Sequence, residues 1–281
     1  MSSLPGMAAV LALLSALLWG TADFAGGLAS RRLPALVVVG WSQIAALAAL
    51  LAVVGASRTW ADPDTWLLWG LAAGVSGAGG LVCFYRALAI GTMGVVSPIG
   101  ALGALVPVLV GLASGDRPSQ VQVVGMALAL LGAVAASGPE LSGSARGASV
   151  ALAALAGLLF GLALVLISRG AQGSPLLTAT AMRFSSLVLF GTVALLARTT
   201  GGVARRDVPM LVAIGVADGA ANVLFGFAST LGLVSVVAVL GSLYPVGTVL
   251  LARGILGERL LPVQVAGVAV ALGGVALLSA G

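Results

Sequence analysis

Four charged side chains lie inside long apolar stretches of the sequence, and they are the residues best placed to do chemistry. They are Asp23, Arg86, Arg183 and Asp218. An ionisable group at the centre of a bilayer costs at least ~2.5 kcal/mol, so such a group usually faces a partner or a water-filled cavity. We therefore consider these residues as candidates for substrate binding, for carrying a proton, or for a buried ion pair.

The composition excludes several other kinds of chemistry. The chain has no His and one Cys, Cys83, which removes disulfide frameworks, Cys/His metal sites and catalytic His dyads. It has no Gly-rich loop followed by Lys and Ser or Thr, so we expect no ATP hydrolysis. All 13 basic residues are Arg and they are scattered along the chain, unlike the basic face of a nucleic-acid-binding protein. We expect no metal, no cofactor and no nucleic-acid partner.

The balance of apolar and charged residues is that of a membrane protein. Hydrophobic residues make up 60% and charged residues 7% of the 281 residues, whereas a soluble domain has about 25% charged residues. Charges, prolines and polar clusters divide the chain into ten apolar blocks, each close to the ~20 residues that cross a bilayer. The blocks are 5–28, 35–56, 66–90, 94–114, 120–139, 148–168, 175–198, 208–231, 234–253 and 262–280. The sequence therefore predicts an all-α membrane protein with ten transmembrane helices.

An internal repeat divides the chain into two similar halves. The repeat is found when the sequence is shifted against itself by 141 residues. The matched pairs include Trp19 with Phe160 and Phe84 with Phe225. We predict two five-helix repeats, at residues 1–142 and 143–281. Because five is odd, the second repeat must enter the membrane from the opposite side. Inverted repeats of this kind are typical of secondary transporters, whose substrate site lies near the midplane between the halves.

Counting along the blocks places the four charges at two depths. Asp23 and Arg86 lie four or five residues before the ends of their blocks, about 6–8 Å from the same membrane surface, and we expect a structural ion pair between them. Asp218 and Arg183 fall near the midplane, and Asn222 shares a helix face with Asp218. Two interpretations remain open for this deeper pair. Either Asp218 carries a proton while Arg183 attracts a substrate carboxylate, or the two neutralise each other as a latch.

Three aromatic residues join the candidates for substrate binding. Trp19 lies near the centre of its block, where the indole N–H needs a partner. Tyr244 precedes Pro245 in mid-block, and a proline inside a helix frees a backbone carbonyl. The third aromatic residue is Tyr85. We predict a substrate site formed by Trp19, Tyr85, Arg183, Asp218, Asn222 and Tyr244, with Asp23 and Asp218 as the candidates for proton coupling.

Short motifs in both halves carry a resemblance to a known family. They are Trp19-Gly20-Thr21, Phe84-Tyr85-Arg86-Ala87-Leu88-Ala89-Ile90-Gly91, Val95-Val96-Ser97-Pro98, Ser242-Leu243-Tyr244-Pro245 and Leu256-Gly257-Glu258-Arg259. These motifs resemble the EamA domains of the drug/metabolite transporter superfamily, one domain in each half. The resemblance implies a ten-helix inner-membrane permease that exports small metabolites such as amino acids, and no enzyme. The chain departs from the family pattern at Gly115-Asp116-Arg117, where the family has Gly-Glu-Arg, and at Ser42-Gln43, where the family has an Arg. Arg183 supplies that Arg in the second half.

From these observations we expect a secondary active transporter that exports a small metabolite such as an amino acid by alternating access. Its expected partners are the small-molecule substrate, the lipid bilayer and protons, and we expect a monomer in the plasma (inner) membrane. Loops on the side of Arg31 and Arg32 carry more Arg than loops on the other side, so the positive-inside rule places both termini outside. Three alternatives stay open: a multidrug or cation efflux carrier, a non-transporting membrane subunit, and a lipid-modifying enzyme.

Overall fold

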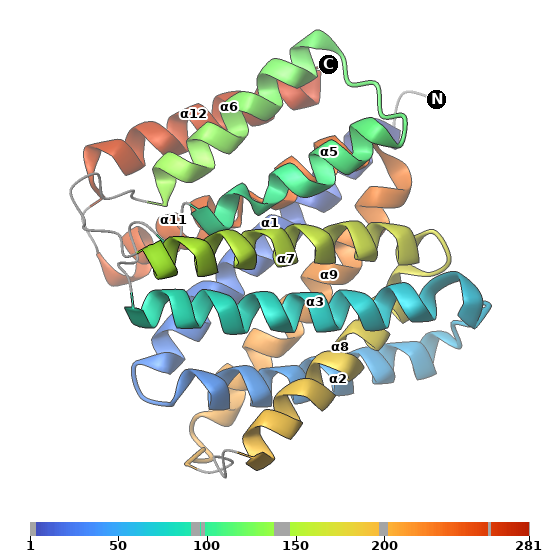
Figure 1. Ribbon diagram of the computed structural model, residues 1–281, viewed down its shortest axis with the longest axis vertical. Coiled ribbons are helices and arrows are strands. Elements are labelled where there is room, and N and C mark those ends of the chain that lie inside the picture. Colours follow the sequence, from blue (N-terminus) through green and yellow to red (C-terminus); the bar gives the residue numbers. More distant parts are fainter. Residues whose placement is uncertain are drawn as a thin grey trace.

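The computed structural model describes residues 4–90, 96, 99–137, 147–196, 202–257 and 260–280, and every regular element in these ranges is a helix (Figure 1). In the first half the helices are α1 (Leu4–Ser30), α2 (Ala35–Ser57), α3 (Pro63–Ile90), the short 3-10 helix η1 (Leu102–Ala104), α5 (Leu105–Ala113) and α6 (Gln120–Ala136). In the second half they are α7 (Gly147–Ala171), α8 (Pro175–Leu196), α9 (Val208–Leu231), α10 (Val234–Gly241), α11 (Tyr244–Leu256) and α12 (Pro262–Ala280).

The helix boundaries follow the helix-breaking residues of the sequence. Pro34 directly precedes α2, and Gly257 ends α11 with φ at 66°, a left-handed conformation that glycine adopts at little cost. Ser119 and Gln122 begin α6 with a capping box, in which each side chain bonds the backbone N–H of the other residue. Because these ends are marked by proline, glycine and caps, the helices lie close to the apolar blocks of the sequence.

Six helical segments are long and apolar enough to cross a membrane. They are Gly6–Ser30, Ala35–Ser57, Pro63–Phe84, Gly147–Ala171, Val208–Leu231 and Val234–Leu256. The other helices of the described chain are shorter or less apolar. Two of the predicted blocks are interrupted: block 94–114 contains η1, and block 234–253 breaks at Ser242 between α10 and α11. Both interruptions occur in the fourth block of a half, so the two halves share the same irregularity.

The packing of the helices is symmetric with respect to the two halves. Helix α1, the first helix of the first half, packs on α9, the third helix of the second half. In the same way α7, the first helix of the second half, packs on α3, the third helix of the first half. The same holds for α2 on α9 and α3 on α8. Equivalent helices also meet each other, α2 with α8 and α6 with α12, and α6 and α12 lie side by side in Figure 1. The fourth blocks of the two halves meet through α5 and α10. The main helix contacts between the two halves therefore recur with the halves exchanged, as expected for two repeats that pack face to face.

Aromatic contacts at the interface repeat the same symmetry. The rings of Trp19 and Phe225 lie 5.7 Å apart, and those of Phe84 and Phe160 lie 6.1 Å apart. The 141-residue shift of the sequence turns one pair into the other. Centroid separations of this size are typical of favourable aromatic pairs. Each pair joins the first helix of one half to the third helix of the other.

Close packing of α2 on α9 depends on Gly215. A Cβ at this position would overlap the backbone carbonyl of Ser42 and come within 2.9 Å of the Ala46 nitrogen. We expect Gly215→Ala to lower the free energy of unfolding by about 1–3 kcal/mol, the usual cost of overpacking. Thermal unfolding in detergent measures this change. Gly40→Ala is the control, because a Cβ there has no neighbour within 4 Å; equal melting temperatures for the two variants would contradict the prediction.

Two features of the repeats stay predictions: their boundary at residue 142 and their opposite orientation in the membrane. Reporter fusions test both. A reporter that is active only in the cytoplasm is fused after residue 142 in one chain and after residue 281 in another. Five crossings in each half predict opposite activities for the two fusions. Equal activities would contradict the division into five and five.

Candidate functional site

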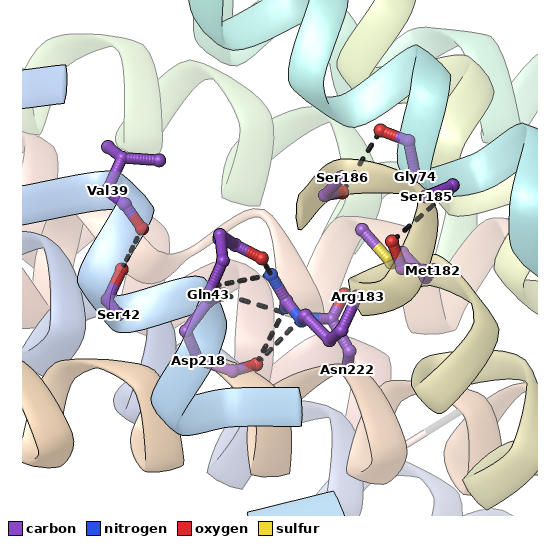
Figure 2. Close-up of polar contacts among 10 residues, drawn as sticks. All are labelled: Val39, Ser42, Gln43, Gly74, Met182, Arg183, Ser185, Ser186, Asp218 and Asn222. Atoms are coloured by element: carbon purple, nitrogen blue, oxygen red, sulfur yellow. Dashed lines mark hydrogen bonds and ion pairs between the residues drawn. The ribbon is translucent and has the colours of Figure 1, made fainter. Parts of the chain in front are cut away.

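The two deep charges of the sequence form an ion pair at the centre of the molecule. Nη1 of Arg183 on α8 lies 2.8 Å from Oδ2 of Asp218 on α9 (Figure 2). Arg183 is 3% exposed, whereas the side chain of Asp218 is 26% exposed. The sequence predicts the same membrane depth for Arg183 and Asp218, and in the structure their side chains are in direct contact.

The remaining donors of Arg183 are largely occupied by neighbouring groups. Nη1 also donates to Oε1 of Gln43 on α2 at 2.9 Å, and Nη2 donates to the backbone oxygen of Asp218 at 3.3 Å. Asn222, predicted on the same face of α9, donates from Nδ2 to that same backbone oxygen at 2.7 Å. Nε of Arg183 is buried without a hydrogen-bond partner among the described residues. In this conformation Arg183 therefore has the geometry of a latch that ties α8 to α2 and α9.

Two serines next to Arg183 fix the position of α8. Ser185 donates to the backbone oxygen of Leu71 at 2.9 Å. Ser186 donates to the backbone oxygen of Gly74 at 3.1 Å, as Figure 2 shows. Both acceptors belong to α3, so hydrogen bonds hold α8 against the first half within one turn of Arg183. These two hydrogen bonds therefore join α8 to the first half next to the residue that binds Asp218.

Asp23 occupies an unusual place on α1. It continues a face of the helix formed by Ala12, Ala16 and Trp19, which are spaced by three or four residues. Ala12 and Ala16 are buried, at 0% and 4% exposed, whereas Asp23 is exposed. The opposite face of α1 carries the exposed apolar side chains Val10, Leu14 and Leu17. Asp23 therefore lies on the side of α1 that faces the other helices and not on its exposed apolar side, and its side chain is accessible there.

Groups from two other helices surround Asp23. Asp218 on α9 and Tyr244 on α11 are close enough to interact with it electrostatically. Gly20, one turn earlier on α1, lets α11 approach closely, and its backbone oxygen accepts a hydrogen bond from Oγ1 of Thr248 at 3.1 Å. Asp23 and Tyr244 were predicted separately from the sequence, and the fold brings them together with Asp218.

The ion pair predicted between Asp23 and Arg86 is not formed between these two described side chains. Helix α1 packs mainly on α9, α11 and α10, whereas α3, which carries Arg86, packs on α7 and α8. Arg86 is exposed on α3. The equal depth expected from the sequence thus does not bring the two side chains together, because α1 and α3 pack on different helices. The side chain of Tyr85 lies outside the described residues.

The two ends of the interior differ, and we name them after Ser30 and Asp116. Ser30 ends α1, and a pocket beside it is lined by residues from both α1 and α9. The lining residues are Leu28, Ala29, Arg31, Arg32, Leu33, Arg206, Asp207, Met210 and Leu211. Since α9 begins at the Ser30 end, its other end and the start of α10 lie at the opposite end of the molecule, where Asp116 is found.

At the Asp116 end, hydrogen bonds join the two halves. Oδ2 of Asp116 accepts from the backbone N–H of Ser235 at 2.9 Å and from its hydroxyl at 2.7 Å. Nη2 of Arg169 donates to Oγ of Ser114 at 2.9 Å. We did not predict Asp116 or Ser235 as functional residues. The available signal was the Gly-Asp-Arg motif, which stood out in the sequence as a departure from the family pattern.

The sequence also matches a known family across both halves. The sequence model of the EamA-like transporter family matches residues 6–138 and again residues 147–280. The chain belongs to the EamA-like transporter family, as its motifs indicated. Members of this family are membrane transporters.

Comparison with solved structures supports the fold. One crystal structure, whose description gives no activity, superposes with a TM-score of 0.79 at 20% sequence identity, covering 96% of this chain and 95% of that chain. At this identity the likeness shows the fold alone. A search of curated proteins finds no match.

Proposed function

We propose that the protein is a secondary active transporter that exports a small metabolite, such as an amino acid, by alternating access. The observation that carries this proposal is the difference between the two ends of the interior. Asp23 is exposed on the inward face of α1, whereas Asp116 and Ser235 tie the halves together at the opposite end. A site that is open at one end and closed at the other is what one stage of an alternating-access cycle requires.

The pseudo-symmetry supplies the second stage of the cycle. Because the main helix contacts between the halves have counterparts with the halves exchanged, the same fold can support a conformation closed at the Ser30 end and open at the Asp116 end. Inverted-repeat transporters change between such states by rocking one repeat against the other around a fixed site. The interrupted helices at η1 and between α10 and α11 lie where the two halves meet.

The residues around the central ion pair have proposed roles in this cycle. Arg183, Asp218 and Asn222, together with Trp19, Tyr85 and Tyr244, are the proposed substrate-binding residues. Protons are the proposed coupling ion, with Asp23 and Asp218 as their carriers, because a carboxylate in a desolvated interior can bind and release a proton. The expected location is the plasma (inner) membrane as a monomer, and the Arg distribution places the Ser30 end in the cytoplasm. An exporter loads its substrate from that side.

Transport by purified protein in liposomes tests the proposal. Liposomes preloaded with one amino acid of a panel are given the same labelled compound outside, with and without a pH gradient. We expect exchange of at least one compound without a gradient and its accumulation with one. Protein-free liposomes are the control. If no compound in a broad panel of amino acids and other small metabolites is exchanged or accumulated, the result would contradict transport and would favour a non-transporting subunit or an enzyme.

A further inference from the structure

We propose that Asp23 binds the positively charged amino group of the transported substrate. The carrier would then accept amines and amino acids and reject compounds whose only charge is negative. This inference rests on the proposed transport function and names the class of substrate that the interior site recognises.

The first argument is the charge balance of the interior. Among the described residues that line the centre, the charged groups are Asp23, Asp218 and Arg183. Arg183 and Asp218 neutralise each other at 2.8 Å. Asp23 has no ion-pair or hydrogen-bond partner in the described part of the chain, so one negative charge remains. The carboxylate of Asp23 is therefore free to pair with a cationic group of the substrate in a charge-assisted hydrogen bond.

The second argument is access. Asp23 is exposed on the face of α1 whose earlier residues Ala12 and Ala16 are buried, and Gly27 and Ser30, further along this side of the helix, are exposed as well. Ala16, two turns before Asp23, is 4% exposed. The exposure along α1 therefore rises from the middle of the molecule toward the Ser30 end. A solute entering from that end meets the carboxylate of Asp23 before it meets the buried ion pair.

The third argument is the aromatic surface beside Asp23. Trp19 lies one turn before Asp23 on the same face, and its ring packs on Phe225 at 5.7 Å. Tyr244 lies on α11 within electrostatic range of Asp23. Ammonium groups are attracted to the faces of Trp and Tyr rings, and the same rings give an apolar contact for the rest of a small substrate. A carboxylate with aromatic neighbours suits an organic ammonium group better than an anion.

Two other ligands fit the site less well. Arg183 is the only interior cation described that a substrate carboxylate could reach, but it is 3% exposed and both of its terminal nitrogens are engaged. A divalent metal ion is disfavoured because no cluster of three or more His, Cys, Asp or Glu occurs among the residues searched. The ammonium group is therefore the ligand that charge, access and neighbouring side chains favour together.

Matched compounds test the inference. The probes form two sets of three compounds. One set is isoamylamine, leucine and 4-methylpentanoate, and the other is phenethylamine, phenylalanine and 3-phenylpropanoate. Within each set the compounds differ mainly in their charged groups. Binding to purified protein in nanodiscs is followed by Trp fluorescence, and exchange is followed in liposomes. We expect the wild type to bind an amine or amino acid and to ignore the matching anion. Asp23→Asn should weaken that binding at least tenfold, Asp23→Glu should retain the preference for the cation, and the surface variant Asp64→Asn should behave as the wild type.

Several outcomes would overturn the inference. It is wrong if an anion binds as well as its matching amine, or if Asp23→Asn binds the amine as tightly as the wild type. It is also wrong if the compounds exchanged in the liposome panel lack an amino group, in which case transport stands and only the substrate class fails. If neither these probes nor the panel is bound or exchanged by the wild type, the proposed function fails and this inference fails with it. Melting temperatures of the Asp23 variants near that of the wild type establish that the losses are not due to unfolding.

Discussion

Asp218→Asn is expected to destabilise the protein strongly, because it leaves the guanidinium of Arg183 buried without its counter-ion. Arg183 is 3% exposed, and its Nη1 lies 2.8 Å from Oδ2 of Asp218. Removing one partner of a buried ion pair costs roughly 3–5 kcal/mol. Arg183→Gln in the same chain removes the orphaned charge, so the double variant should regain much of the lost stability.

Melting temperature and pH-gradient-driven uptake, measured on the same variants, separate the two interpretations of this pair. The latch predicts a large loss for Asp218→Asn and a recovery in the double variant. The control Asp64→Asn, an exposed carboxylate in the first turn of α3, should melt close to the wild type. If Asp218→Asn melts like the wild type but loses the response to the gradient, Asp218 carries the proton and the latch is wrong. If Asp218→Asn changes neither the melting temperature nor the response of uptake to the pH gradient, Asp23 becomes the candidate for proton coupling.

Asp116→Ala is expected to open the end of the molecule that is closed in this structure. The change removes both hydrogen bonds to Ser235, which join the halves. Hydrogen bonds to charged groups contribute about 1.5–3 kcal/mol, so the ratio of open to closed conformations at this end should rise roughly tenfold or more. The measurement is the rate at which a thiol reagent labels Ala8→Cys on α1 in a Cys83→Ser background, because Ala8 is 3% exposed at this end.

A variant in the first turn of α6, the helix that follows this loop, serves as the control for Asp116→Ala. Gln122→Ala removes the capping box of α6, which lies within the first half and does not bridge the two repeats. We expect it to leave the labelling of Ala8→Cys unchanged while lowering stability slightly. Equal increases in labelling for both variants would indicate a general loosening of the loop, and Asp116 would not be a gate.

The overall architecture could be predicted because it depends on regularities within the sequence. Helix positions follow from apolar blocks ended by proline, glycine and charge, and the repeat follows from matched positions such as Phe84 and Phe225. The contact of Arg183 with Asp218 corresponds to a depth that can be counted from helix ends at a fixed rise per residue. These features require no knowledge of which helix packs on which.

Features that depend on the packing of helices could not be read from the sequence. Asp23 and Arg86 share a depth, yet α1 and α3 face different helices, so the predicted pair does not form. Gln43 was noted as a departure from a family pattern, but only the approach of α2 to α8 shows that it binds Arg183. Likewise, only the packing of α11 on α1 shows that Tyr244 lies within electrostatic range of Asp23.

The labelling of two cysteines near opposite ends of α1 tests alternating access most directly. Gly27→Cys is exposed toward the Ser30 end, where a Cβ has no neighbour within 4 Å, and Ala8→Cys is buried toward the Asp116 end. Each is measured alone, with and without Asp116→Ala. The account predicts reciprocal changes: when Asp116→Ala raises the labelling of Ala8→Cys, it lowers that of Gly27→Cys. A rise at Ala8→Cys with no fall at Gly27→Cys would contradict alternating access.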